Sequence, residues 1–339
     1  MKRMKKRLVC LVLSFSLCLS AVGCASGGAS GSAPAVSSRG MSSSVVQHAK
    51  PTAVELLDGK KVIFIGNSYT HFGNCVIPTA QSVYSQTERT GDQGYFHQLC
   101  AANGLNVTVT DFTYGGHTFD DFYTGACAAD RGHDGLNHLD YLTDRDYDYV
   151  ILQEGPGANS KTNILAECEP VMKLFRDVNP DTKFIFLVHQ RVHDRRLSWR
   201  SSIKELDQAG VTVVDWGALV YDVFSGAVQV PGAVQTYNKN SFIVSQSESD
   251  GYHPNILTGY ITALMTYCAI TGESAVGQSY DFVTDASIQS RFGPFTFRQK
   301  YYTYNMETNF EAILNSAQDM NGLQQLADQY LAAKPYLEY

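Results

Sequence analysis

Five short apolar runs, each followed by enough chain for a helix, constrain the fold more than any other feature of this sequence. They are KVIFIG (61–66), NVTVTDF (106–112), DYVILQ (148–153), KFIFLVHQ (183–190) and VTVVDW (211–216). Their apolar residues are continuous rather than alternating, which indicates strands that are covered on both faces. We therefore expect an α/β protein with a parallel sheet inside a three-layer α/β/α sandwich.

Helix signals fill the stretches between these runs. Candidate helices span 76–86, 95–102, 164–178 and 198–209, and the last three are closed by Gly104, Asn179-Pro180 and Gly210. A mixed stretch runs from Trp216 to Ser249, followed by helix candidates over 255–271 and 303–333. Because ligands of parallel sheets bind at the carboxyl ends of the strands, we look for chemistry there.

The length and composition allow a large core. With 339 residues and 44% hydrophobic content, the chain can hold one large domain or two small ones. We expect the folded domain over 56–339, with a helical C-terminal extension from about Gly272. The sequence leaves open whether this extension caps the domain or forms a lid.

The N-terminus has the pattern of an export signal followed by a tether. MKRMKKR is basic, and LVCLVLSFSLCLS after it is apolar but too short to span a bilayer comfortably. SAVGC then resembles the lipobox of bacterial lipoproteins, which implies a signal peptide over 1–23 and lipidation of Cys24. The alternative is cleavage near Ala25 and release of the protein. A Ser/Gly/Ala-rich composition predicts a flexible tether over 24–55. The expected location is extracytoplasmic, on the bacterial cell membrane through a lipid anchor only.

Charge and cysteine content exclude several classes of function. The formal net charge of −7 becomes −12 once the five Lys and Arg of residues 1–23 are removed. Such an acidic balance disfavours nucleic acid and anionic lipid as ligands, so we expect a neutral partner. The five cysteines after Cys24 contain no CxxC pair, which indicates neither a zinc site nor a dense disulfide framework. An odd number leaves at least one thiol free, which we expect to be buried.

Three polar features follow the first three strands. GNSYT places Ser68 on a strand-to-helix turn, beside a helix N-terminus that favours negative charge. The paired glycines of TYGGHTF can bring backbone N–H groups close to an oxyanion. LQEGPGAN carries the carboxamides of Gln153 and Asn159, which can donate N–H groups. Each feature alone also has a simpler interpretation, as an N-cap, a tight turn or a loop.

A fourth feature, DGYHPN, supplies a base and a carboxylate from one loop. A nucleophilic serine needs a base, and a histidine base needs a carboxylate that fixes its tautomer. Asp250 and His253 lie three residues apart just before a helix candidate. We therefore expect Ser68, His253 and Asp250 to form a catalytic triad.

Together, GNSYT, the glycine after the second strand, a carboxamide after the third and a late DxxH resemble the SGNH hydrolase superfamily. These proteins are also called GDSL-like esterases and lipases, and the resemblance covers about residues 61–254. It implies a flavodoxin-like sandwich and ester hydrolysis through a serine acyl-enzyme, without a metal or other cofactor. It matches Ser68 to the nucleophile, Gly116 to the second-block glycine, and Asp250 and His253 to the last block. The third block of the superfamily usually reads GxND, whereas this sequence has QEGPGAN. Together with the GNSYT opening, this resembles a divergent branch of the superfamily.

This departure leaves the side-chain donor of the oxyanion hole open. We expect the backbone N–H groups of Ser68 and Gly116 to be completed by Gln153, because a strand end is held more rigidly than a loop. Asn159 is the second candidate.

The expected function is an extracytoplasmic serine esterase that removes small acyl groups, such as acetyl, from carbohydrate esters. The acetyl and carbohydrate parts rest on the superfamily's habits. One alternative is a non-catalytic glycan- or solute-binding lipoprotein, and another is an acyltransferase with the same triad. The expected partner is a small-molecule or glycan ester. The sequence does not fix an oligomeric state.

Other histidines have no clear catalytic pattern. His189 and His193 are four apart, but arginines surround them and His189 ends a strand, so a substrate contact by His189 is preferred to a metal site. His133 and His138 lie in an acidic run that lacks the ligand spacing of an EF-hand. His117 either lines the site or packs beneath it.

Overall fold

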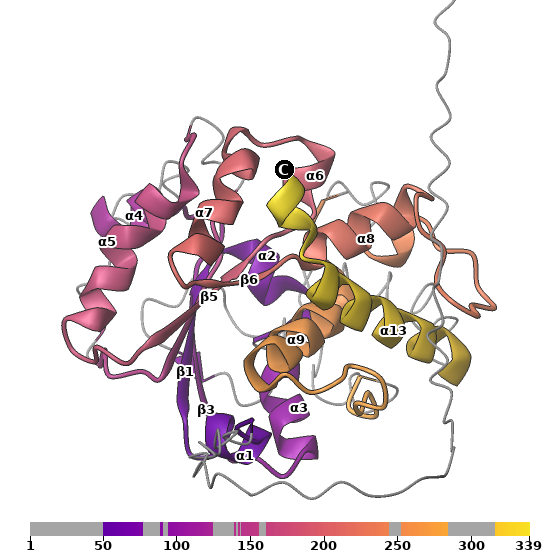
Figure 1. Cartoon of the computed structure of the whole chain (residues 1–339), viewed down its shortest axis with the longest axis horizontal. Helices are drawn as coiled ribbons and strands as arrows, with labels where there is room; N and C mark the ends of the chain where they lie inside the picture. The colour runs from indigo at the N-terminus through magenta and orange to yellow at the C-terminus, as the bar shows by residue number, and fades with distance from the viewer. Residues whose placement is uncertain are drawn as a thin grey trace, which may run out of the picture. The chain divides into compact units, whose positions relative to one another are not determined.

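A six-stranded sheet in the order β2-β3-β1-β4-β5-β6 forms the centre of the protein (Figure 1). The strands are β1 (Lys61–Gly66), β2 (Arg89–Thr90), β3 (Thr108–Thr113), β4 (Tyr149–Leu152), β5 (Lys183–Leu187) and β6 (Thr212–Val214). All of them are parallel except β2, which pairs antiparallel with β3 at the edge. The five strands predicted from the sequence are therefore confirmed, and their parallel order changes direction at β1.

The structure is a computed structural model, and it describes most of the chain from Lys50 onward. The described residues are 50–76, 89–90, 94–124, 139, 142, 144–155, 161–243, 252–283 and 316–339. Residues 50–339 form one compact unit. The expected signal peptide, Cys24 and nearly all of the expected tether lie outside the described residues.

Helices cover both faces of the sheet, which confirms the three-layer sandwich (Figure 1). One face packs against α1 (Ala53–Leu57), α3 (Tyr95–Ala102), α8 (Trp216–Phe224), α9 (Ile256–Thr271) and α13 (Ala317–Ala333). The other packs against α4 (Phe119–Thr124), α5 (Ile164–Arg176) and α7 (Ile203–Gln208). Two short helices, α2 (Ser68–His71) and α6 (Arg191–Asp194), follow the carboxyl ends of β1 and β5.

The strands are continuously apolar because alternate side chains enter two different cores. Along β1, Val62 and Phe64 belong to the core that contains α3 and α9. Ile63 and Ile65 belong to the core that contains α4 and α5. All four side chains are fully buried. A strand between two helical layers thus has no solvent-facing position, as the uninterrupted apolar run predicted.

Most predicted helices are present, with differences at their ends. Helices α3 and α9 match the expected ranges within one residue, and α5 ends two residues early, at Arg176. The stretch over 198–209 is a 3₁₀ helix (Ser198–Ser202) that continues into α7. Most of the helix expected over 76–86 lies outside the described residues.

Helix α8 begins at Trp216, which was expected to end the fifth strand, whereas β6 ends at Val214. Asp215 caps this helix, and its carboxylate accepts a hydrogen bond from the backbone N–H of Ala218 at 2.9 Å. Trp216 looked like the end of a strand because only Asp215 separates it from the β-branched run over 211–214. The cap residue immediately before it carries the helix signal.

The C-terminal segment packs as part of the sandwich where it is described. Met320, Leu323 and Leu326 of α13 are buried in the same core as α8 and α9.

The domain begins earlier in the sequence than expected, because α1 starts at Ala53, inside the range expected for the tether. Thr52 and Glu55 form a capping box there, which allows a short helix to begin before residue 56.

No helix in the part of the chain that the structure describes is long and apolar enough to cross a membrane.

Candidate active site

Ser68 is the first residue of α2, directly beyond the carboxyl end of β1. Asn67 caps this helix, and its side-chain oxygen accepts a hydrogen bond from the N–H of Tyr69 at 3.1 Å. The preceding Gly66 lies so close to β4 that a Cβ atom there would be 3.0 Å from the backbone oxygen of Gln153. The sequence GNS therefore makes a tight exit from the sheet and places the serine hydroxyl at the sheet edge.

His253 meets Ser68 across 185 residues of sequence. Its Nε2 atom lies 2.8 Å from Ser68 Oγ, which is the distance of a hydrogen bond from the hydroxyl to a neutral imidazole. The rings of Phe72 and Tyr252 contact the imidazole, with centroid distances of 4.2 and 4.4 Å. This arrangement supplies a base at the oxygen of the expected nucleophile.

The two residues directly after His253 fix the chain at that point. Pro254 forms an isolated bridge with Ile243. Asn255 caps α9 and donates its side-chain N–H to the backbone oxygen of Ser241 at 2.9 Å. Asp250, the expected carboxylate of the triad, lies outside the described residues, so its role stays a prediction. The same holds for Asn159 and for Cys24.

Gly116 lies in a turn next to the end of β1. The N–H of Tyr114 donates to the backbone oxygen of Gly66 at 2.9 Å, and the N–H of His117 closes the turn on Tyr114 at 3.2 Å. Gly116 has φ of +83°, which favours glycine. Among the described residues, no hydrogen bond uses the backbone N–H of Ser68 or Gly116. Both donors expected for the oxyanion hole are thus left for another acceptor.

Gln153 is buried and braces the turn that carries Ser68. Its side-chain oxygen accepts hydrogen bonds from the N–H of Asn67 at 3.2 Å and from the hydroxyl of Thr70 at 2.9 Å. Its side-chain amide donates to the backbone oxygen of Glu154. Because the Asn67 N–H can only donate, the orientation of the amide is settled. The oxyanion role of Gln153 stays a prediction, while its hydrogen bonds within the protein show a bracing role.

Asn67 was missed as a site residue and joins two loops. Its side-chain amide donates to the backbone oxygen of His117 at 2.7 Å, which ties the GNS turn to the TYGGH turn. An aspartate at this position would have no N–H to donate. Gly155 completes the arrangement, because a Cβ there would lie 2.5 Å from the Asn67 amide nitrogen.

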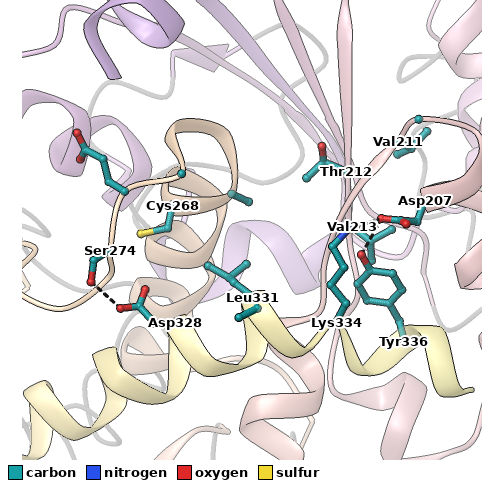
Figure 2. Close-up of a pocket in the computed structure, with 15 residues that line it drawn as sticks. Asp207, Val211, Thr212, Val213, Cys268, Ser274, Asp328, Leu331, Lys334 and Tyr336 are labelled. Carbon is teal, nitrogen blue, oxygen red and sulfur yellow. Dashed lines mark hydrogen bonds and ion pairs between the residues drawn. The ribbon is translucent and has the colours of Figure 1, made fainter. Parts of the chain in front are cut away.

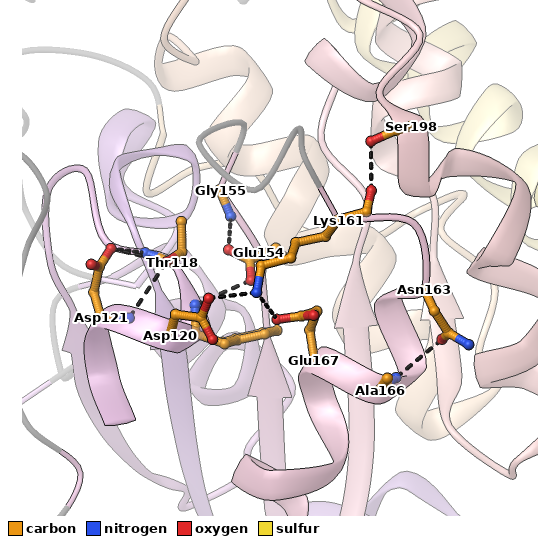
Figure 3. Close-up of polar contacts among 11 residues, drawn as sticks. Thr118, Asp120, Asp121, Glu154, Gly155, Lys161, Asn163, Ala166, Glu167 and Ser198 are labelled. Atoms are coloured by element: carbon orange, nitrogen blue, oxygen red, sulfur yellow. Dashed lines mark hydrogen bonds and ion pairs between the residues drawn. The ribbon is translucent and has the colours of Figure 1, made fainter. Parts of the chain in front are cut away.

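Glu154 is a fully buried carboxyl group behind these loops (Figure 3). It accepts hydrogen bonds from the backbone N–H groups of Phe119 at 3.1 Å and Gly155 at 2.5 Å. Burial raises its pKa to about 8, with a smaller contribution from the negative charges of Glu167 and Asp120, although the two N–H donors oppose the rise. The ammonium group of Lys161 lies 2.5 Å from the carboxylate of Asp120 and 3.1 Å from that of Glu167. Figure 3 shows these two ion pairs beside Glu154.

The segment after β5 contacts Tyr69 and Tyr252, which are the sequence neighbours of Ser68 and His253. His189 is fully buried and stacks on Tyr69 with a centroid distance of 4.3 Å. Burial lowers the pKa of His189 to about 3, so its ring is neutral at neutral pH. Gln190 donates its side-chain N–H to the backbone oxygen of Tyr252 at 2.6 Å. His189 therefore packs against the turn that carries Ser68, through Tyr69. Among the described residues, no cluster of His, Cys, Asp and Glu around it could hold a metal ion.

His133 and His138 lie outside the described residues. His117 is buried, and its ring lies among Tyr114 and Phe122 with centroid distances of 5.6 and 5.2 Å. Four cysteines, at 75, 100, 168 and 268, are free and buried, as expected of thiols used as small apolar residues.

An open pocket of about 750 Å³ lies elsewhere, between β6, the end of α9 and α13 (Figure 2). Its charged groups pair with their neighbours. Lys334 contacts Asp207 at 3.0 Å, and the hydroxyl of Ser274 donates to Asp328 at 2.6 Å. The pocket begins at the start of β6, whereas Ser68 lies beyond the end of β1, so the two places are at different edges of the sheet.

No family model matches the chain. No curated protein matches it by sequence. Solved structures are similar to it in fold. A DUF4886 family protein from Bacteroides uniformis is 12% identical with a TM-score of 0.46, over 81% of this chain and 95% of that one. A variant of an acetyl xylan esterase from Geobacillus stearothermophilus is 16% identical with a TM-score of 0.40, over 63% and 96%. A protein provisionally described as an SGNH hydrolase, from Slackia heliotrinireducens, is 13% identical with a TM-score of 0.36, over 63% and 99%.

Proposed function

We propose that the protein is a serine esterase in which Ser68 is the nucleophile and His253 is the general base. The observation that carries this proposal is the 2.8 Å separation of Ser68 Oγ and His253 Nε2, at the carboxyl edge of a parallel sheet. In this mechanism His253 accepts the proton of Ser68 as the hydroxyl attacks the ester carbonyl, and then gives it to the leaving alcohol. Water repeats the sequence on the acyl-enzyme.

The backbone around Ser68 supports stabilisation of the tetrahedral intermediate. The N–H groups of Ser68 and Gly116 are assigned to the developing oxyanion, and Gln153 or Asn159 is the candidate third donor. Asp250 is assigned to the second ring nitrogen of His253, where it would stabilise the imidazolium. We further propose a small acyl group, acetyl in the first instance, and a carbohydrate alcohol.

Hydrolysis of p-nitrophenyl acetate tests the reaction. We expect Ser68→Ala to lower kcat by at least about 10⁴-fold, because removal of the nucleophile of a triad has an effect of that order. A serine-directed phosphonate should label the wild type at Ser68 and leave Ser68→Ala unlabelled. Ser225→Ala, at an exposed serine on the end of α8, is the matched control and should keep full activity.

Unchanged hydrolysis by Ser68→Ala, with a matching melting temperature, would remove the basis of the proposal. A wild-type protein that binds acetylated glycans and neither hydrolyses them nor reacts with the phosphonate would identify a binding protein instead.

The cellular location is a separate proposal. We propose that Cys24 carries the lipid anchor and that the domain acts outside the cytoplasm. In a detergent phase partition of whole cells, the wild type should enter the detergent phase and Cys24→Ser should enter the aqueous phase. Recovery of both proteins in the aqueous phase would support cleavage near Ala25 and release.

A further inference from the structure

Arg191 lies over the ring of Tyr252, the residue next to His253. In the proposed reaction, His253 donates its proton to the oxygen of the leaving alcohol, so the alcohol must bind beside the imidazole. Tyr252 is there, with its ring centroid 4.4 Å from that of His253. The Arg191 guanidinium carbon is 5.4 Å from the centroid of the Tyr252 ring. A cation is therefore held two ring contacts away from Ser68.

The guanidinium group has donors that the protein does not use. Its Nη1 donates to Asp194 Oδ2 at 3.3 Å, a long contact with a carboxylate of the same short helix. The Nε atom is buried and has no hydrogen-bond partner among the described residues. A guanidinium carries five N–H groups in a planar fork, and a buried N–H without an acceptor is unfavourable. The fork therefore keeps N–H groups that have no acceptor among the described residues.

The chain segment that leads into Arg191 is fixed by two contacts of Gln190. Gln190, which is 2% exposed, hydrogen-bonds to the backbone of Tyr252 and so joins the segment after β5 to the histidine loop. Beneath it, Gly217 of α8 packs so tightly that a Cβ there would lie 2.6 Å from the Gln190 nitrogen. Tyr252 is 39% exposed and is the one exposed aromatic residue in the described part of the chain. The segment before Arg191 is therefore anchored to the backbone of Tyr252, whose ring is exposed to solvent beneath the guanidinium.

We propose that Arg191, held over the ring of Tyr252, binds an anionic group on the alcohol half of the substrate. The group is a carboxylate or a phosphate, because the planar guanidinium fork matches two oxygens of either one. This inference rests on the esterase function proposed above and adds the substrate class. It departs from the neutral partner expected from net charge, since recognition depends on the charge at the site rather than on the sum over the chain.

Three acetyl esters of one sugar test the inference. They are the acetyl esters of methyl glucoside, methyl glucuronide and methyl glucoside 6-phosphate, which differ only at C6, and the quantity is the ratio of kcat/KM for each anion to that of the neutral ester. For the wild type we expect a ratio of about ten, because a partly exposed, charge-assisted contact between the guanidinium and the anion stabilises the bound ester by roughly that factor. The carboxylate and phosphate arms decide which anion the site prefers. Arg191→Gln should lower the ratio to about one, and Arg191→Lys should give a value between the two because it keeps the charge without the fork.

Arg176 offers a matched control. It also contacts a carboxylate at 3.3 Å, that of Glu169, and lies over an aromatic ring, that of Phe184 at 4.9 Å. It differs in position, at the last turn of α5 and the amino end of β5, away from Ser68. Arg176→Gln removes the same formal charge and should keep the wild-type ratio.

Binding separates the failure of this inference from the failure of the esterase function. Calorimetry with Ser68→Ala should show tighter binding of the anionic esters than of the neutral ester, also if no ester is hydrolysed by the wild type. A wild-type ratio of one, or an equal ratio in Arg191→Gln and the wild type, overturns the inference while p-nitrophenyl acetate hydrolysis still supports the esterase. Equal binding of the three esters by Ser68→Ala overturns it as well.

Discussion

Replacement of Glu154 by glutamine should remove a large pH dependence of stability. The carboxyl group is fully buried in the folded protein, where its pKa is about 8 instead of the ordinary 4.5. Below pH 4.5 the group is protonated in both the folded and the unfolded state. Between pH 4.5 and 8 the unfolded state releases the proton first, so the free energy of unfolding falls as the pH rises. Above about pH 8 both states are ionised and the loss is complete.

The magnitude follows from the size of the pKa difference. A difference of about 3.5 units, at 1.36 kcal/mol per unit, gives a loss of about 5 kcal/mol across this window. Glutamine has nearly the same shape and cannot ionise. The difference in unfolding free energy between the wild type and Glu154→Gln should therefore fall by about that amount from pH 4.5 to pH 9. Asp120, Glu167 and Lys161 surround the group and stay the same in both proteins.

Urea denaturation followed by the fluorescence of Trp199 and Trp216, both buried, measures this difference at each pH. Glu55→Gln is the control with the opposite sign. The pKa of the Glu55 carboxyl is lowered by hydrogen bonds from Thr52, so its contribution is present above the ordinary pKa of 4.5 and is lost as the pH falls below it. If the Glu154 difference stays constant from pH 4.5 to 9, the buried carboxyl does not resist ionisation and the reasoning from desolvation is refuted.

Two further predictions concern close contacts around the site. Asn67→Asp replaces the N–H donor to His117 with an oxygen that faces the carbonyl, so we expect kcat for p-nitrophenyl acetate to fall about tenfold; unchanged kcat would show that the two turns hold their positions without this bond. Gly259→Ala, whose Cβ would overlap the backbone oxygen of Gly73, should lower the unfolding free energy by about 3 kcal/mol or more in thermal denaturation. Gly115→Ala, with nothing within 4 Å of its Cβ, is the matched control and should melt close to the wild type.

The fold was largely predictable because burial on both faces leaves a strong local signal. Each of the five parallel strands is a continuous apolar run, and α3, α5 and α7 end near the turn residues that were used to close them. Several of the missed elements have a short signal. Strand β2 has two residues, and α2 and α6 have four each, which is less than a period of two or 3.6 can reveal.

The site was predictable at the level of strand ends and less so at the level of single contacts. Ser68 and His253 lie 2.8 Å apart. The place of Ser68 follows from the end of a parallel strand, whereas His253 precedes α9 and was selected from the spacing of Asp250 and His253. The bonds of Gln153 were not predictable from its position. A carboxamide at a strand end can donate to an oxyanion or brace a neighbouring turn, and the choice depends on Asn67 and Thr70, more than eighty residues earlier.

The net charge of the sequence favours a neutral substrate, whereas the charge of Arg191 near the site favours an anionic one. We expect the charge near the site to determine which substrate binds. Fixed charges more than a Debye length of about 8 Å from a ligand are largely screened at physiological salt. The acidic excess is summed over the whole sequence, whereas Arg191 lies over the ring of Tyr252, which in turn contacts the imidazole of His253. This placement depends on a contact between segments 62 residues apart, such as that of Gln190 with Tyr252. Amino-acid composition carries no information on that contact. The charge near His253 therefore follows from the folded structure and not from the sum of charges.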